Sequence, residues 1–407
     1  MDVPFRGPSR STAFWSVAVL LVLVLAASGV PSPLYRVYQA QFGFSSGLLT
    51  LVFGIYSFAL LGALLVVGAL SDHVGRRPVL AVALLLQAAA MVLFLLADGV
   101  GWLLVARVVQ GLSVGALTGA LGAALLDFQR SDRPVGALVN SASPGVGLAL
   151  GASGAGLLVQ FVDEPTTWVF GVLTAFFLLA AAGVRLLPES SPRIPGALAS
   201  LRPQVHIPVS RRRAFVVVLP CLVATWALGG LYLSLGPSLA ASVFGIDNHL
   251  VGALLILAMN GTSAVGSVTM QKVSPERAMV VGALVFATGV AGTVGALLSG
   301  STALFFGAAV VSGFGFGSAF LGAMATVTHG VAAGERAGLL SSVFVVGYLS
   351  FSLPAIAAGL AAAQFGLART AEIYGTALVV LALTAVAGLR LRRRTAEPAE
   401  PSELLVA

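Results

Sequence analysis

The strongest constraint on this chain of 407 residues is a series of long apolar runs that recurs along its length. A helix needs about 20 apolar residues to cross a bilayer, and twelve runs approach or exceed that length. In the first half they cover Phe14–Val30, Leu48–Leu70, Val79–Ala97, Trp102–Leu126, Val139–Phe161 and Trp168–Leu187. In the second half they cover Ala214–Val243, Leu250–Met270, Ala278–Leu298, Ala303–Val327, Ala337–Ala361 and Ile373–Leu389. The runs are continuous rather than alternating, which excludes an outer-membrane barrel and predicts an all-α membrane protein.

The composition excludes a soluble fold. Hydrophobic residues make up 58% of the chain and charged residues only 9%, whereas soluble chains carry about 25% charged residues. The first run could be read as a signal peptide, but its apolar stretch is too long and eleven more spans follow. We therefore interpret it as the first membrane span.

Basic residues gather on one side of the predicted spans. With the amino terminus in the cytoplasm, all but three of the 22 Lys and Arg residues face that side. The exceptions are Arg36 and Arg369 in outer loops and Arg107 within a span. The positive-inside rule therefore predicts a multi-pass protein of the inner (plasma) membrane with both termini in the cytoplasm.

The polar stretch near the middle of the chain divides the spans into two sixes. We predict an N-terminal six-helix bundle over 1–187, a cytoplasmic linker over 188–213, a C-terminal six-helix bundle over 214–394 and a disordered tail over 395–407. A faint repeat supports the division, because Phe42–Ser45 and Phe244–Asp247 occupy matching places 202 residues apart. Ser45 and Asp247 are each suited to cap the helix that follows. Transporters are often built from such repeats, with the solute site between them.

The sequence offers little for metal, cofactor or nucleotide chemistry. Cys221 is the single cysteine, and the four histidines are far apart in the sequence, so we predict no metal site. Lys272, the single lysine, lacks the glycine-rich loop that holds nucleotide phosphates, and no cofactor is predicted. The basic residues flank apolar runs instead of forming one stripe, so nucleic acid is not an expected partner.

The loop after the second run reads Gly68-Ala-Leu-Ser-Asp72-His-Val-Gly75-Arg76-Arg77-Pro78. A short connection between membrane helices needs only turn residues and positive charge, and the acid with two arginines exceeds that need. This pattern resembles the signature loop of the major facilitator superfamily, although His73 stands where a basic residue is usual. The resemblance extends over all twelve spans and the central loop. It implies a twelve-helix fold of two bundles in which Asp72, Gly75, Arg76 and Arg77 form a conformational latch. One hypothesis pairs Asp72 with the start of the eleventh span, near Glu335–Gly338.

Arg107 is the one charge placed inside an apolar run. A charge at the centre of a bilayer costs at least about 2.5–3.5 kcal/mol on insertion scales, so a compensating partner is expected. Arg107 shares a helical face with Gly111 and Gly115, and Gln110 adds a polar group nearby. The alternative is that the arginine extends to the outer surface. Resemblance to the family's fourth-helix motif implies that Arg107 and Gln110 act in proton coupling or organise the central cavity.

The fifth run contains small residues at four-residue spacing, including Gly147 and Gly151. With Gly111 and Gly115 they are predicted to permit close helix packing. The run also resembles the family's antiporter motif, although Ala152 replaces its proline and Ala155 one of its glycines. This resemblance favours export.

The family resemblance implies a cavity lined by the first, fourth, seventh and tenth helices. The candidate cavity residues are aromatic or polar: Tyr35, Arg107, Gln110, Trp226, Tyr232, Phe316 and Phe320, with Asn260 and Tyr348 as second choices. No acid lies near the middle of a predicted span, which weakens the case for proton antiport. Asp72, Asp127 and Glu335 are possible relays by position alone.

These patterns together predict a secondary active transporter of the major facilitator type. The predicted activity is export of a small hydrophobic or amphipathic organic solute by alternating access, with protons as a candidate counter-ion. The alternatives are facilitated uptake of a small metabolite and a membrane sensor that does not transport. An enzyme is not expected, since no nucleophile, acid pair or metal cluster meets a plausible substrate site. The expected partners are the solute and the lipid bilayer, and we expect a monomer.

Overall fold

The computed structural model describes residues 9–130, 135–246 and 248–396, and within these ranges it contains helices and no strand. The first half comprises α1 (Arg10–Gly29), α2 (Pro31–Phe42), α3 (Ser46–Val67), α4 (Leu70–Val74), α5 (Arg76–Leu95), α6 (Val100–Phe128), α7 (Gly136–Phe161), α8 (Pro165–Gly183) and the 3-10 turn η1 (Val184–Leu186). The linker carries α9 (Ala197–Ser200) and η2 (Val209–Arg211). The second half comprises α10 (Arg212–Ser234), α11 (Gly236–Phe244), α12 (His249–Met270), α13 (Pro275–Ser299), α14 (Thr302–Thr328), α15 (Ala333–Phe365) and α16 (Leu367–Ala396).

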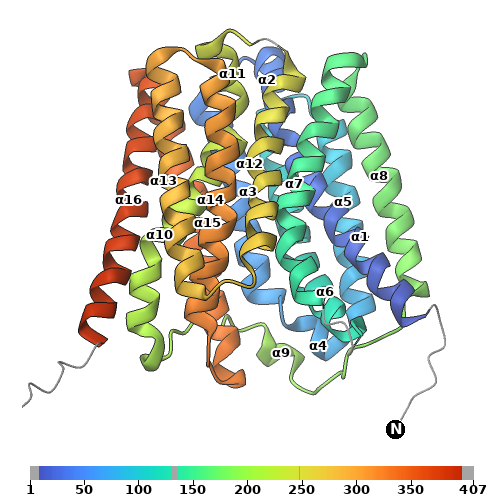
Figure 1. The fold of residues 1–407 in the computed structure, drawn as a ribbon. Helices are drawn as coiled ribbons and strands as arrows, with labels where there is room; N and C mark the ends of the chain where they lie inside the picture. Colours follow the sequence, from blue (N-terminus) through green and yellow to red (C-terminus); the bar gives the residue numbers. More distant parts are fainter. Residues whose placement is uncertain (1–8, 131–134, 247, 397–407) are drawn as a thin grey trace, which may run out of the picture.

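Among the described residues, 12 helical segments are long and apolar enough to cross a membrane, which confirms the predicted count. They run side by side as one bundle (Figure 1), and α1 begins and α16 ends at the same end of the bundle as α4 and α9. We call this the linker end. Helix α16 continues to Ala396, two residues beyond the predicted boundary, and the rest of the predicted tail lies outside the described residues.

The first span continues past its predicted end at Val30 as a second helix, and the seventh predicted span is bent into two helices. Helix α1 gives way to α2 at Val30, and α10 gives way to α11 at Leu235. A proline lies in the first turn of α2 and of α11, where its missing N–H costs no helical hydrogen bond. The prolines therefore redirect the helices and do not end them.

The second member of each bent pair ends in the same way. Gly43 follows α2 with φ 68° and Gly245 follows α11 with φ 64°, a left-handed conformation that glycine adopts without strain. Ser45 then caps α3, as predicted. In the second half the cap is Asn248, whose side chain accepts from the N–H groups of Leu250 and Val251. Asp247, the predicted cap, lies outside the described residues.

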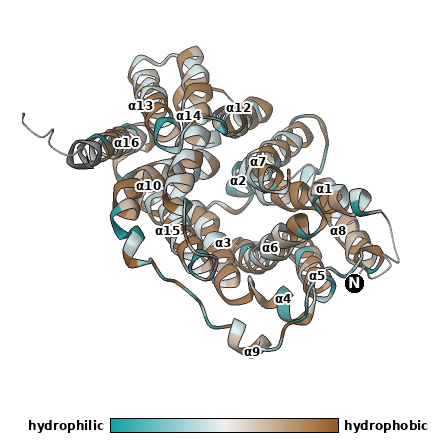
Figure 2. Cartoon of the chain, turned by 60° about the horizontal axis from the view of Figure 1, so that its bottom comes forward, coloured by the Kyte–Doolittle hydropathy of each residue, from teal (hydrophilic) through white to brown (hydrophobic). Residues whose placement is uncertain are grey.

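Two helix pairs, α3 with α15 and α7 with α12, form most of the contact between the halves, and α2 adds smaller contacts with α11 and α12. Gly47 near the start of α3 lies against Leu360, and Gly54, about two turns further along α3, lies against Ile356. Both contacts lie in the part of α3 away from the linker end, because α3 starts at the opposite end of the bundle (Figure 1). Figure 2 shows the molecule from the linker end. The helices are mostly apolar, and polar segments are concentrated in loops and in the linker, which carries α9 and runs past α4.

Candidate functional site

The Arg107 side chain is buried in the interior of the first half. It lies in α6 with 1% of its surface exposed, so it does not extend to the outer surface. Its Nε donates to the hydroxyl of Tyr35 in α2 at 2.9 Å, and Nη2 donates to the same oxygen. Its Nη1 donates to Oε1 of Gln110 at 2.7 Å. The structure thus brings three predicted site residues into one hydrogen-bonded cluster.

Gln110 connects this cluster to the bend between α1 and α2. Its Nε2 donates to the carbonyl oxygen of Ala27 at 3.0 Å. In an unbroken helix that carbonyl would accept from the N–H of residue 31, but Pro31 has none. The amide of Gln110 therefore supplies the donor that the proline removed, which explains a polar side chain at a fully buried position.

The charge of Arg107 is compensated by aromatic rings rather than by an acid. Its Cζ lies 4.7 Å from the ring centroid of Tyr56 in α3 and 5.5 Å from that of Tyr35. Cations bind aromatic faces at these separations, and the interaction strengthens when both groups are out of water. Within the described part of the chain no carboxylate pairs with this guanidinium. The cluster therefore keeps a formal positive charge.

An aromatic cluster faces this site from the second half. The ring centroid of Trp226 in α10 lies 4.8 Å from Tyr348 and 6.2 Å from Phe351, both in α15. It lies 6.0 Å from Phe320 in α14, which in turn packs with Phe316. Four predicted cavity residues are thus brought together. The indole Nε1 of Trp226 is buried and has no hydrogen-bond partner among the described residues.

The two clusters meet across the contact between α3 and α15. The hydroxyls of Tyr56 and Tyr348 are close enough to interact electrostatically, and the rings of Phe53 and Phe351 lie 5.0 Å apart. Phe53, Tyr56 and Phe351 were not predicted from the sequence. Tyr348 and Phe351 share one face of α15 at a three-residue spacing, which is the pattern that could have indicated the second of them.

Two other cavity candidates lie elsewhere. Tyr232 is 1% exposed and its hydroxyl is 2.9 Å from Oγ1 of Thr293 in α13, so it packs inside the second half. Asn260 is 7% exposed, and its Nδ2 donates to the Ile256 carbonyl of its own helix at 3.1 Å. Its backbone lies against Gly145, at the contact between α7 and α12. The contacts of both residues therefore lie outside the aromatic cluster.

A second polar cluster, at the linker end, is built around Arg76. This side chain is 5% exposed. Its Nη1 lies 2.5 Å from Oδ1 of Asp72 and 2.6 Å from Oγ of Ser71, and its Nε lies 3.2 Å from Oδ2 of Asp127 in α6. Two carboxylates therefore compensate one buried guanidinium.

The linker is bound to this cluster through Glu189. Its carboxylate accepts from the backbone N–H of Arg76 at 2.8 Å and of Arg77 at 3.2 Å, at the start of α5. The preceding residue, Gly75, has no side chain to cap the helix, so an acid about 113 positions away in the chain satisfies these donors. Nδ1 of His73 also lies 2.9 Å from the carbonyl oxygen of Ile194.

The hypothesis that Asp72 pairs with the start of the eleventh span is not met in this conformation. Among the described residues its ion partner is Arg76, four positions along, which a short helical turn brings within reach. The backbone of Gly338 near the start of α15 instead accepts from the N–H of His206 in the linker at 3.2 Å. The linker therefore contacts both halves at this end.

The four predicted packing glycines all lie at helix crossings. A side chain at Gly111 or Gly115 would overlap backbone carbonyls of α3, at Tyr56 and Leu60. A side chain at Gly147 or Gly151 would overlap α1, at Leu25 and Ala26. The first crossing packs α6, which carries Arg107, against α3, which carries Tyr56. The second packs α7 against α1. Within the described ranges, no group of three or more His, Cys, Asp or Glu residues could hold a metal ion.

Comparisons with known proteins agree with this architecture. The family model described as the Major Facilitator Superfamily matches residues 17–355. Among curated relatives, the puromycin resistance protein pur8 of Streptomyces alboniger is 32% identical over 189 residues, or 45% of this chain and 37% of that protein. The inner membrane transport protein YajR of Escherichia coli (strain K12) is 26% identical over 195 residues, or 46% and 41%. The matches thus span less than half the length of these relatives.

Solved structures show the same fold at low sequence identity. A bacterial homolog to the human lysosomal transporter Spinster, in an inward-facing and unoccupied conformation, is 17% identical with a TM-score of 0.75, covering 96% of this chain and 99% of that one. The human organic anion transporter MFSD10 is 16% identical with a TM-score of 0.66, covering 93% and 100%. At these identities the likeness concerns the fold.

Proposed function

This chain belongs to the major facilitator superfamily, a family of transporters rather than enzymes, and from that premise we propose that it exports a small hydrophobic or amphipathic organic solute. The observation that supports this most is the meeting of the Arg107 cluster and the Trp226 cluster across α3 and α15. The first presents a cation and hydroxyl groups, and the second presents aromatic faces and an unused indole N–H. A few polar groups in an apolar surround are typical of sites for organic solutes.

The proposed mechanism is alternating access of two six-helix bundles, 1–187 and 214–394, joined by the linker 188–213. The α3–α15 contact between the halves lies near the start of α3 and the end of α15, away from the linker end, whereas the α7–α12 contact at Gly145 lies near the middle of both helices. On the position of the α3–α15 contact we assign this conformation to the state that opens toward the linker end. Separation of α3 from α15 then exposes the two clusters to the opposite side.

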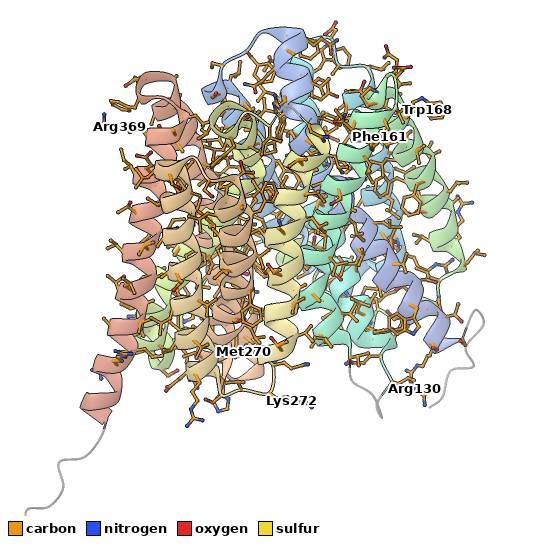
Figure 3. The ribbon with its side chains drawn as sticks, turned by 45° about the horizontal axis from the view of Figure 1, so that its top comes forward. Arg130, Phe161, Trp168, Met270, Lys272 and Arg369 are labelled. Carbon is orange, nitrogen blue, oxygen red and sulfur yellow. The ribbon has the colours of Figure 1, made fainter. Side chains whose placement is uncertain are left out.

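We propose that the linker end faces the cytoplasm of the cell and that the membrane is the inner (plasma) membrane. The predicted charge asymmetry supports this orientation. Arg130 and Lys272 lie at the linker end and Arg369 at the other end (Figure 3). Labelling of single cysteines at Lys272 and Arg369 in intact cells tests it, since only the second is expected to react with an impermeant reagent.

Protons are the proposed counter-ion, with the Arg107 cluster as the coupling element. Within the described part of the chain, no acid lies near the middle of a span, and Asp72, Asp127 and Glu335 lie near helix ends. The Arg107 guanidinium is held only by hydroxyl, amide and aromatic groups, so its electrostatic energy is sensitive to any charge that enters the site. Binding of a proton or of a charged solute would therefore change the stability of this cluster, and that change is the proposed basis of coupling. An exchange of solute without protons is the direct alternative.

Purified protein in liposomes tests the proposal. Puromycin is the first solute to try, because a relative is named for resistance to it, alongside neutral, cationic and anionic amphipathic dyes. Uptake into the lumen driven by an imposed pH gradient supports proton-coupled export. Flux that is independent of the pH gradient favours facilitated diffusion. Saturable binding without flux of any tested solute favours a sensor. An Arg107→Gln variant with unchanged flux and affinity would contradict the assigned site.

A further inference from the structure

A cavity of about 450 Å³ opens at the linker end of the second half, far from the two clusters. It lies between the end of α12, the first turns of α13 and the end of α16. Figure 3 shows Met270, which lines it, and Lys272 close by at the foot of α12. Most of its lining is apolar, and Arg277 and Arg390 are the two charged residues in it.

Neither arginine is used by the fold. Arg277 and Arg390 are both exposed, and neither has a hydrogen bond or ion pair with another residue in the described part of the chain. Glu276, the acid next to Arg277 in sequence, has an interaction of its own. Lys272 is exposed nearby and adds a third cation. The mouth of the cavity is therefore positively charged and open to an external anion.

Part of the apolar lining lies on the outer surface of the bundle. Val281 is 43% exposed on the outer surface of α13, while Leu389 in α16 is 1% exposed and forms the floor. An apolar groove between membrane helices that ends in two cations matches one class of ligand. A phospholipid places its phosphate where guanidinium groups can bind it with paired hydrogen bonds, and its acyl chain continues along the helices. Zwitterionic lipids carry a cation that such a mouth repels, so an anionic lipid is favoured.

We propose that this cavity binds one anionic phospholipid of the bilayer, with its phosphate held by Arg277 and Arg390 and one acyl chain lying along Val281 and Leu389. The bound lipid would contact both the start of α13 and the end of α16 and so connect the two helices. It is independent of the solute site, so its test does not require transport.

The experiment titrates phosphatidylglycerol into the full chain in a neutral detergent and measures bound lipid by native mass spectrometry. The double variant Arg277→Gln/Arg390→Gln is compared with Arg212→Gln/Arg213→Gln, which removes two exposed arginines from the same end of the bundle outside the cavity. An arginine near an anionic lipid contributes a factor of about five in affinity. We expect about 25-fold weaker binding in the first variant and little change in the second.

Two further arms separate the sources of binding. Val281→Trp fills the exposed groove while keeping both arginines, and we expect it to weaken lipid binding at least several-fold. Glycerol 1-phosphate, which carries the head-group charge without an acyl chain, is expected not to bind at lipid concentrations. Equal loss in both arginine pairs, equal affinity for phosphatidylcholine, or comparable binding of glycerol 1-phosphate overturns the proposal. Circular dichroism of each variant verifies that it remains folded.

Discussion

Arg107 and Tyr35 lie 72 positions apart in the chain, and two guanidinium nitrogens donate to the one phenolic oxygen, Nε at 2.9 Å and Nη2 beside it. Both side chains are 1% exposed. The pair joins α6 to α2, the helix that exists because Pro31 redirects the first span. The site therefore depends on the bend at Pro31 that positions α2 and on the Arg107 side chain of α6.

Tyr35→Phe removes the acceptor and leaves both Nε and Nη2 of Arg107 without a partner. Loss of a hydrogen bond to a charged group costs about 1.5–3 kcal/mol, so thermal stability should fall and solute affinity should fall with it. Tyr38→Phe is the matched control, since Tyr38 lies on the same helix and donates to the Phe94 carbonyl at 3.2 Å. Both variants lose stability, but only the first should change flux in liposomes. Equal flux in the two variants would show that the pair is only structural.

Gln110→Leu leaves two buried groups without a partner, the Ala27 carbonyl and Nη1 of Arg107, of which only the carbonyl can be satisfied by a restored backbone N–H. The expected loss is about 1–3 kcal/mol in unfolding free energy. Pro31→Ala restores a backbone N–H that can bond that carbonyl, so part of the cost should disappear in the double variant. A double-mutant cycle by thermal denaturation measures this coupling. Strict additivity would contradict the explanation of Gln110 given above.

Gly151→Val should destabilise the first half, because any Cβ there overlaps the Ala26 carbonyl at the crossing with α1. Overpacking of this kind costs about 1–3 kcal/mol or more. Gly154→Val, on the same helix, has no heavy atom within 4 Å of the added Cβ and should be nearly neutral. Fluorescence-detected size exclusion after heating distinguishes the two. Similar losses for both glycines would remove the packing argument.

Asp72→Asn should slow transport and change the accessibility of cysteine probes at the linker end. The substitution removes one of the two carboxylates that compensate the buried Arg76 and leaves Asp127 alone. Asp163→Asn is the control, because Asp163 is an exposed acid in the loop between α7 and α8, at the other end of the bundle. Transport assays with single-cysteine labelling at the start of α15 provide the measurement. Unaltered flux together with unaltered labelling would dismiss the latch.

A cross-link between Gly47→Cys and Leu360→Cys should arrest transport. The Cβ of residue 47 would lie 3.7 Å from the Cα of residue 360, so the two positions are in direct contact across the halves. The link holds α3 and α15 together, and a reducing agent should restore flux. Cys221→Ser provides the background, since Cys221 is the single native cysteine. Full activity in the oxidised protein would exclude separation of these helices during transport.

The first and seventh spans show where sequence reasoning was incomplete. A proline in a membrane span often marks a helix end, and only the structure reveals that α2 and α11 continue beyond the prolines here. A proline in a first turn is compatible with a new helix, and whether one forms depends on what its apolar face packs against. The same holds for Tyr232, whose place beside Thr293 is decided by the crossing of α10 and α13.

Hydropathy and charge by themselves determined the twelve spans, since the cost of burying polar groups in lipid acts on each segment locally. The motif around Asp72 and the charge of Arg107 in the fourth span marked two places where charged groups occur although burying them is costly. Only the tertiary structure decided their partners: Tyr35 and Tyr56 for Arg107, and Glu189 for the start of α5. Those contacts join residues far apart in the chain, and packing between helices, which no single segment encodes, brings them together.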